Sequence, residues 1–145
     1  MVDWERVAPE FLPTERWGDI ELIRPELVYA LHAFRLRINT PIVVSYGTQG
    51  QHAEDSEHYT GHAVDVVIPK VAMDGMLDLF IEATRFPFTS IGLYTYWRYE
   101  KRLCPGMHLG IEPRDVRKYW IRIEDATGLS DWGMTLKSLR WLGLV

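Results

Sequence analysis

Short runs rich in β-branched and aliphatic residues fill the middle of the chain and decide which folds are open to it. Residues 42–46, 62–68, 90–94 and 107–111 each have the length and composition of a buried strand, and 119–123 is a further candidate. Helical periodicity marks 25–38 and 73–83, and a last helix is expected from Ser130 to Gly143. The pattern predicts an α+β fold with a small central, mostly antiparallel sheet and flanking helices.

The chain is expected to form one domain over residues 1–145. This length suits a single core, no linker or repeat divides it, and a lone cysteine, Cys104, excludes an internal disulfide framework. A net charge of −4 argues against general electrostatic binding to nucleic acid. No apolar run approaches the ~18–20 residues that insert across a membrane. The start also lacks a secretory signal, which suits a phage-encoded lysis protein released by other means, a domain separated from its leader, or a cytoplasmic protein.

A polar segment, 47–61, precedes the second predicted strand. It contains glycines and no periodicity, which predicts a long surface loop of the kind that is often functional. Along the strand that follows, alternation turns Val64 and Val66 toward the core and Asp65 toward the opposite face. A glycine just before the strand permits the sharp turn that brings His58 back over Asp65.

The fourth predicted strand repeats this arrangement. Alternation turns Met107 and Leu109 toward the core and His108 toward the other face. Two strands of one sheet would then present Asp65 and His108 side by side, with His58 above them. Two imidazoles and one carboxylate are a sufficient ligand set for a catalytic Zn²⁺, which keeps a fourth position for water. An ordinary polar role for each residue is the alternative, since the chain lacks the His-Glu-x-x-His pattern of many zinc peptidases.

Five residues between positions 56 and 65 fall at fixed offsets: Ser56, His58, Gly61, Ala63 and Asp65. Together they give Ser-x-His-x-x-Gly-x-Ala-x-Asp, which resembles the motif of zinc D-Ala-D-Ala carboxypeptidases and related LAS-type peptidoglycan metallopeptidases. The resemblance covers about residues 25–111 and implies the fold that this family shares with the hedgehog signalling domain. It makes His58, Asp65 and His108 the zinc ligands. Ser56 and Gly61 would shape the loop, and Ala63 would keep the site open.

The resemblance breaks at the acidic residue that serves the family as general base. Many members place Glu or Asp three residues before the last histidine ligand, but this chain has Pro105 at that position. Some members place an acid two residues after the histidine, but this chain has Gly110 there. Glu112 and Glu100 are the nearest acids along the chain. Alternation favours Glu112, whereas Glu100 needs its loop to fold inward. The family arginine that grips a substrate carboxylate is also absent, because Ser45 is followed by Tyr-Gly-Thr.

Other polar and aromatic side chains flank the expected cleft in sequence. The residues expected to line it or to contact substrate are Ser56, Tyr59, His52 and Tyr94. His52 can stabilise an oxyanion there, although an exposed loop histidine is the commoner case. His62 is expected on the core face, where it is either buried and hydrogen-bonded or orients a metal ligand through a hydrogen bond.

The resemblance therefore implies a zinc-dependent peptidase that cleaves peptidoglycan stem or cross-link peptides through a metal-activated water. Its partner would be that peptide or another peptide substrate, with no nucleic acid involved. The alternative is a zinc-bearing, non-catalytic module that binds peptidoglycan or protein and has lost the general base. A metal-free structural domain, for instance in a phage particle, is a third hypothesis.

Overall fold

The structure is a computed structural model, and it describes residues 1–125 and 127–145. The α-helices in this part of the chain are α1 (Pro25–Ile38), α2 (Met76–Ala83) and α3 (Leu136–Trp141). Two short 3-10 helices are η1 (Glu57–Thr60) and η2 (Met73–Gly75). The strands are β1 (Val43–Tyr46), β2 (Ala63–Val67), β3 (Ser90–Tyr94), β4 (Arg98–Tyr99), β5 (Arg102–Leu103), β6 (Gly106–Gly110), β7 (Lys118–Asp125) and β8 (Gly128–Gly133).

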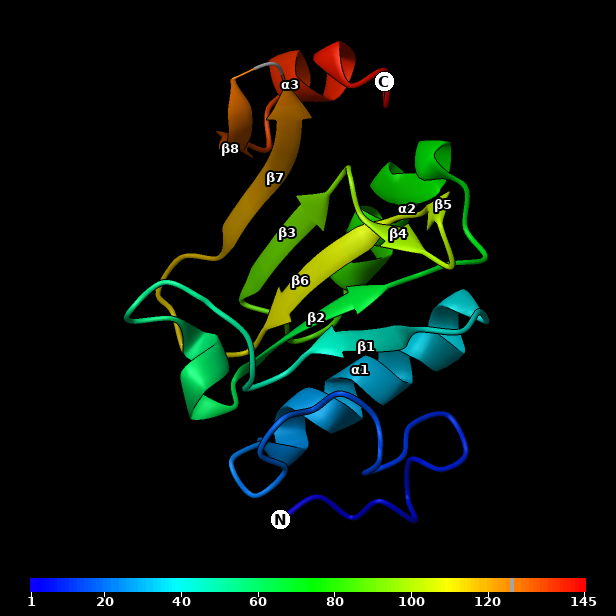
Figure 1. Cartoon of the computed structure of the whole chain (residues 1–145), viewed down its shortest axis with the longest axis vertical. Coiled ribbons are helices and arrows are strands. Elements are labelled where there is room, and N and C mark those ends of the chain that lie inside the picture. Colours follow the sequence, from blue (N-terminus) through cyan, green and yellow to red (C-terminus); the bar gives the residue numbers. More distant parts are fainter. Residues whose placement is uncertain (126) are drawn as a thin grey trace.

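Six strands form one mixed sheet in the order β1-β2-β6-β3-β7-β8 (Figure 1). Neighbouring strands are antiparallel throughout, except that β3 and β7 run parallel. β4 and β5 pair separately as a short ribbon. The predicted α+β fold, with a mostly antiparallel central sheet and flanking helices, is confirmed.

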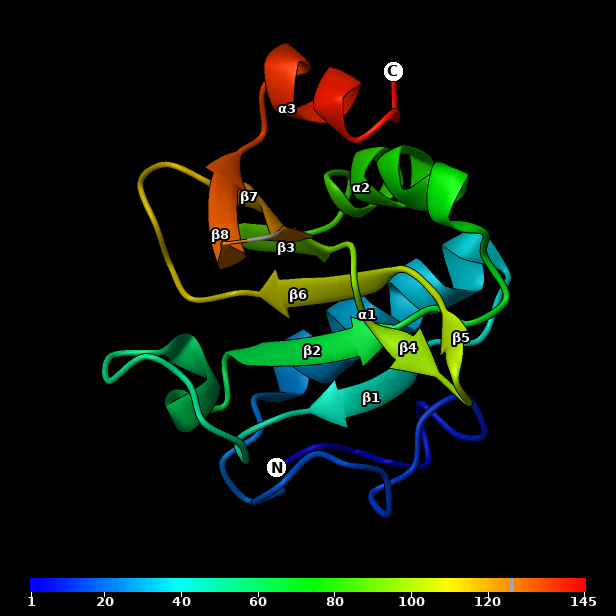
Figure 2. The same cartoon turned by 45° about the horizontal axis from the view of Figure 1, so that its top comes forward.

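Helix α1 packs against the sheet through the apolar stripe that its sequence predicts. It begins with Pro25, which the first helical turn tolerates, and is followed by the cap residue Asn39, where φ is 49° and the backbone N–H donates to the Arg35 carbonyl. Leu27 and Leu31 are fully buried. Each apolar side chain of this size contributes roughly 1.5–3 kcal/mol when it leaves water. Figure 2 shows α1 passing behind the strands, with α2 close to it.

Alternation along the central strands separates two faces of the sheet. Val64 of β2 and Leu109 of β6 belong to the hydrophobic core on the helix side. Asp65 and His108 are their neighbours in sequence and so point to the opposite face, which we call the site face. Residues 47–61 run beside the start of β2 and the end of β6 (Figure 1).

The N-terminal residues anchor the beginning of the 47–61 segment. Residues 1–24 contain neither helix nor strand, yet Trp17 is fully buried. The backbone N–H groups of Gly47 and Thr48 donate to the carbonyls of Arg16 and Trp17 at 3.2 and 2.8 Å. The segment that precedes β2 is thereby tied to the body of the protein at its first residues.

Residues 47–61 hold more structure than the predicted surface loop. They contain η1, in which the Ser56 hydroxyl accepts a hydrogen bond from the His58 backbone N–H. Gly61 ends this turn with a left-handed φ of 73°. A single 3-10 turn of four residues is too short to produce a periodic pattern, so the sequence does not reveal it.

The predicted start of the last helix is wrong. Ser130 lies in β8, which pairs antiparallel with β7, and α3 begins only at Leu136. Thr135 caps this helix and forms a capping box with Ser138, a stronger start signal than an isolated serine. Among the described residues, no helix combines the length and the apolar character that crossing a membrane requires.

Replacing Gly61 by alanine is expected to destabilise the protein strongly. A Cβ at this position would lie 1.9 Å from the Leu22 carbonyl oxygen, in addition to the unfavourable positive φ. Gly143→Ala is the matched control, because φ is +69° there and no atom lies within 4 Å of the added Cβ. Urea unfolding should show a loss of about 1 kcal/mol for the control and roughly 3 kcal/mol or more for Gly61→Ala. Equal losses would contradict the close packing of Gly61 against Leu22.

Candidate metal centre

Asp65 and His108 are direct neighbours across the β2–β6 pair. The antiparallel register places Asp65 opposite His108. Residues that face each other in this way carry Cβ atoms about 4.5–5.5 Å apart, so both side chains rise from the same spot on the site face. His108 Nδ1 lies 3.2 Å from Asp65 Oδ1, and the two residues are only 6% and 4% exposed.

His58 reaches this pair from η1, and a backbone carbonyl fixes its ring. His58 Nδ1 lies 2.8 Å from the Gly47 carbonyl oxygen. Since a carbonyl only accepts, Nδ1 carries the proton and donates it. The lone pair of Nε2 is then directed at Asp65 Oδ1, 3.3 Å away, and at His108 Nδ1, 3.1 Å away. The loop therefore selects the tautomer that a metal ligand needs.

The three atoms form a triangle of the size that a tetrahedral zinc site requires. His58 Nε2, Asp65 Oδ1 and His108 Nδ1 are separated pairwise by 3.1, 3.2 and 3.3 Å. Zinc with ligand bonds of about 2.0–2.1 Å holds neighbouring ligand atoms about 3.3–3.4 Å apart. The donor set and its spacing both fit such an ion.

Interactions between the clustered side chains outweigh the effect of burial on their pKa values. Burial raises the pKa of Asp65, but the neighbouring His108 and His58 rings, 3.2 and 3.3 Å from its Oδ1, hold that pKa well below its usual range. Burial likewise disfavours a charged His108, yet the carboxylates of Asp65 and Glu57 raise its pKa above the usual value. The cluster thus attracts positive charge at its centre, which either a proton or a divalent cation can supply.

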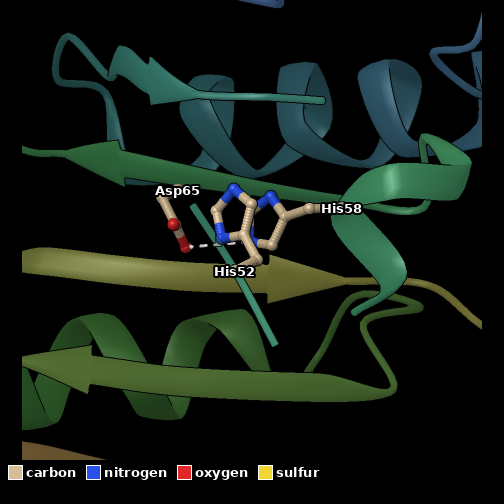
Figure 3. A group of neighbouring side chains, drawn as sticks. All are labelled: His52, His58 and Asp65. Carbon is tan, nitrogen blue, oxygen red and sulfur yellow. Dashed lines mark ion pairs between the residues drawn. The ribbon is translucent and has the colours of Figure 1, made fainter. Parts of the chain in front are cut away.

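His52 lies face to face with His58. The centroids of the two rings are 3.8 Å apart, and the ring planes are within 4° of parallel (Figure 3). His52, His58 and Asp65 form a group that can hold a metal ion, because one ligand atom of each lies within 4.8 Å of the others. An ion in the plane of the His58 ring lies outside the plane of the parallel His52 ring, where no nitrogen lone pair points. His108 completes a tighter triangle than His52 does.

His108 opens onto a cleft of about 600 Å³. Among the sequence-predicted residues, those that line this cleft are His52, Ser56, Tyr94, His108 and Glu112. Tyr94 donates a hydrogen bond to Asp65 Oδ1 at 3.2 Å. Burial and the nearby Asp65 charge raise the pKa of Tyr94 far above its usual value, so the phenol stays a proton donor.

Three of the sequence-predicted residues lie away from this cleft. Tyr59 is 41% exposed, and its hydroxyl bridges the backbone N–H and carbonyl of His52 at 2.9 and 3.2 Å. Glu100 occupies the exposed turn between β4 and β5. His62 is half-buried rather than buried, because it precedes β2, and its Nδ1 lies 2.8 Å from the Thr60 hydroxyl.

Glu57 is a site residue that sequence reasoning missed. Its side chain is buried, its Oε1 lies 2.8 Å from His108 Nε2, and the Ser90 hydroxyl donates to the same oxygen. Burial raises the pKa of Glu57, but the hydrogen bonds from His108 and Ser90 lower it to about 2, so the carboxylate is ionised. In the sequence, the available signal for a role in the site was that Glu57 directly precedes the predicted ligand His58. Only η1 turns it inward, and that turn leaves no mark on the sequence pattern.

Comparison with protein-family models, curated proteins and solved structures gives no match to this chain. The resemblance described above therefore stands on its motif. The observations made so far establish an α+β fold that carries a His/His/Asp group able to bind a metal ion.

The purified protein is expected to bind one zinc ion, with His108→Ala far more damaging than His52→Ala. Loss of His108 Nδ1 removes a ligand atom and should weaken zinc binding more than about a hundredfold, beyond the range of outer contacts. His52→Ala should cost about tenfold or less, and His32→Ala, in α1, should have no effect. Competition with a chromophoric chelator measures the Kd values. A larger loss in His52→Ala would assign the ion to His52, His58 and Asp65 instead.

Proposed function

We propose that the protein is a zinc-dependent peptidase that acts on peptidoglycan stem or cross-link peptides. The observation that carries this proposal is the triangle of His58 Nε2, Asp65 Oδ1 and His108 Nδ1, with sides of 3.1–3.3 Å, beside an open cleft. The resemblance of the motif to zinc D-Ala-D-Ala carboxypeptidases supplies the reaction class and the substrate class.

In this proposal His58, Asp65 and His108 hold the zinc, which when bound acidifies a water and polarises the scissile carbonyl. Tyr94 keeps Asp65 in place through its hydrogen bond and offers a phenol proton at the cleft. Glu112 lies in the cleft wall and is the acid proposed to take the proton of the attacking water.

Basic side chains in the cleft suit a peptide that carries free carboxylates. Arg114 and Lys118 both line it, and the Lys118 ammonium lies 5.3 Å from the centre of the Trp120 ring. Both residues follow β6 and so lie far along the chain from Ser45. In the resembled family the arginine that contacts the substrate carboxylate comes after the residue that matches Ser45, and this chain lacks it there. They can supply the carboxylate contact from this other direction.

The second candidate is a zinc-bearing module that binds a peptide without cleaving it. One observation favours it: the Glu112 side chain is 42% exposed and lies 3.5 Å from Arg114, in the wall of the cleft rather than buried beside the ligand triangle. An acid so exposed is less suited to proton transfer than a buried one with a raised pKa.

The test is incubation with purified peptidoglycan and with a peptide ending in D-Ala-D-Ala, followed by mass spectrometry. We expect cleavage that EDTA abolishes and stoichiometric zinc restores, with His58→Ala inactive because a ligand is lost. Zinc bound at one equivalent without any product would identify the binding module. Elemental analysis without zinc would contradict both candidates and fit a metal-free structural domain.

Glu112→Gln is expected to lower the cleavage rate by roughly 10²–10⁴-fold, the usual contribution of general acid–base catalysis. Its zinc affinity should change only slightly, because Glu112 does not belong to the ligand triangle. Glu100→Gln makes the same chemical change on the exposed β4–β5 turn and discriminates between the two acids. A loss of rate in Glu100→Gln instead would show that the turn folds inward in the working enzyme.

A further inference from the structure

Glu57 occupies the space that a side chain at position 110 would take. Position 110 follows His108 by two residues on β6 and therefore lies on the same face of the sheet. A Cβ added to Gly110 would lie 2.3 Å from Glu57 Oε1, 2.5 Å from Glu57 Cδ and 2.2 Å from Ser90 Oγ. All three distances are far below normal contact. The missing side chain of Gly110 is what admits the Glu57 carboxylate.

A carboxylate could reach the same point from position 110. Ordinary bond lengths place the oxygens of an aspartate about 2.4 Å from its Cβ. Glu57 Oε1 lies 2.3 Å from the Cβ that Gly110 would carry. An aspartate there could therefore put an oxygen where Glu57 Oε1 now meets His108 Nε2 at 2.8 Å. There is room for one of these two carboxylates.

We propose that Glu57 is the positioning residue of the metal centre and that Gly110 is its obligatory partner. Glu57 holds the His108 ring with Nε2–H toward its own carboxylate and Nδ1 toward Asp65 and His58. This inference rests on the zinc site of the proposed function, and it is independent of whether a peptide is cleaved.

The chemistry follows from what each atom can do. Both ring nitrogens of His108 face a carboxylate, Nε2 at 2.8 Å from Glu57 Oε1 and Nδ1 at 3.2 Å from Asp65 Oδ1, and a carboxylate only accepts. A cation bound at Asp65 would take the place of the Nδ1 proton, and the proton that remains would lie on Nε2, toward Glu57. A carboxylate behind a metal-bound histidine fixes the ring and makes it a stronger ligand. Glu57 itself is held by the Ser90 hydroxyl, and Arg114 lies 3.7 Å from Oε2, which has no hydrogen-bond partner among the described residues.

The first test removes the charge of Glu57 and keeps its size. Glu57→Gln should weaken zinc binding about ten- to hundredfold while the protein stays folded. Glu54→Gln makes the same change on an exposed residue three positions away and should leave the Kd unchanged within twofold. Proton–nitrogen correlation spectra of the wild-type histidine rings, assigned with a His108→Asn variant, should show His108 protonated on Nε2 and zinc-ligated through Nδ1.

The second test moves the carboxylate to β6. The double variant Glu57→Ala/Ser90→Ala removes both side chains that a residue at 110 would meet. Ser90 and Gly110 are opposed in the β3–β6 ladder, so their Cβ atoms can coexist about 4.5–5.5 Å apart. Adding Gly110→Asp to this background should recover zinc affinity at least tenfold. Gly110→Asn, of the same size but uncharged, is the matched control and should recover much less.

Each outcome of these tests either supports the inference or overturns it. An unchanged Kd in Glu57→Gln would overturn it while leaving the zinc site intact. In the zinc-loaded protein, a His108 ring protonated on Nδ1 would overturn it together with the ligand triangle. Equal recovery by Gly110→Asp and Gly110→Asn would overturn it as well. If the double variant fails to fold, the ring spectra of the wild type still decide. A wild-type protein that binds no zinc would overturn the proposed function and this inference together.

Discussion

The register between β2 and β6 is the constraint on which the rest of the site depends. It sets Asp65 directly opposite His108 on a face of the sheet away from the core. A slip by one residue would exchange the two faces of a strand, sending Asp65 toward the helices and Val64 or Val66 toward the cleft. That exchange would bury a charge without a partner, which costs several kcal/mol. Hydrophobic packing on one face thus locks the polar arrangement on the other.

Two flanking segments complete what the strands begin. The Gly47 carbonyl, tied to residues 16 and 17, orients His58 from one side of its ring. Glu57, the neighbour of His58 on η1, orients His108 from the far side of its ring. One short turn therefore carries both a candidate ligand and the support of another candidate ligand. Gly61 closes this turn with its left-handed φ. It is therefore as important to the site as the residues that would touch a metal.

The candidate metal centre and the cleft beside it differ in how deeply their side chains are buried. The side chains of the ligand triangle are buried, with ligand atoms 3.1–3.3 Å apart, whereas Glu112, Arg114 and Lys118 lie in the cleft wall. A buried ligand triangle beside a more open wall suits the proposed peptidase, whose substrate would complete the arrangement. It suits a binding module equally well on geometry alone. Both candidates share the triangle, so the role of Glu112 is what distinguishes the proposed catalysis from binding.

Local sequence pattern determined much of this protein. The stripe of α1 and the alternation in β2 and β6 predict the α+β fold, and they put Asp65 and His108 on one face, because these periodicities act over a few residues. The tertiary structure alone decided which strands pair, that Ser130 belongs to β8, and that Glu57 turns inward beside Gly110. Those features arise from contacts between residues as far apart in the sequence as Glu57 and Gly110, where the cost of an unpartnered buried charge or of two atoms in one space selects a single arrangement.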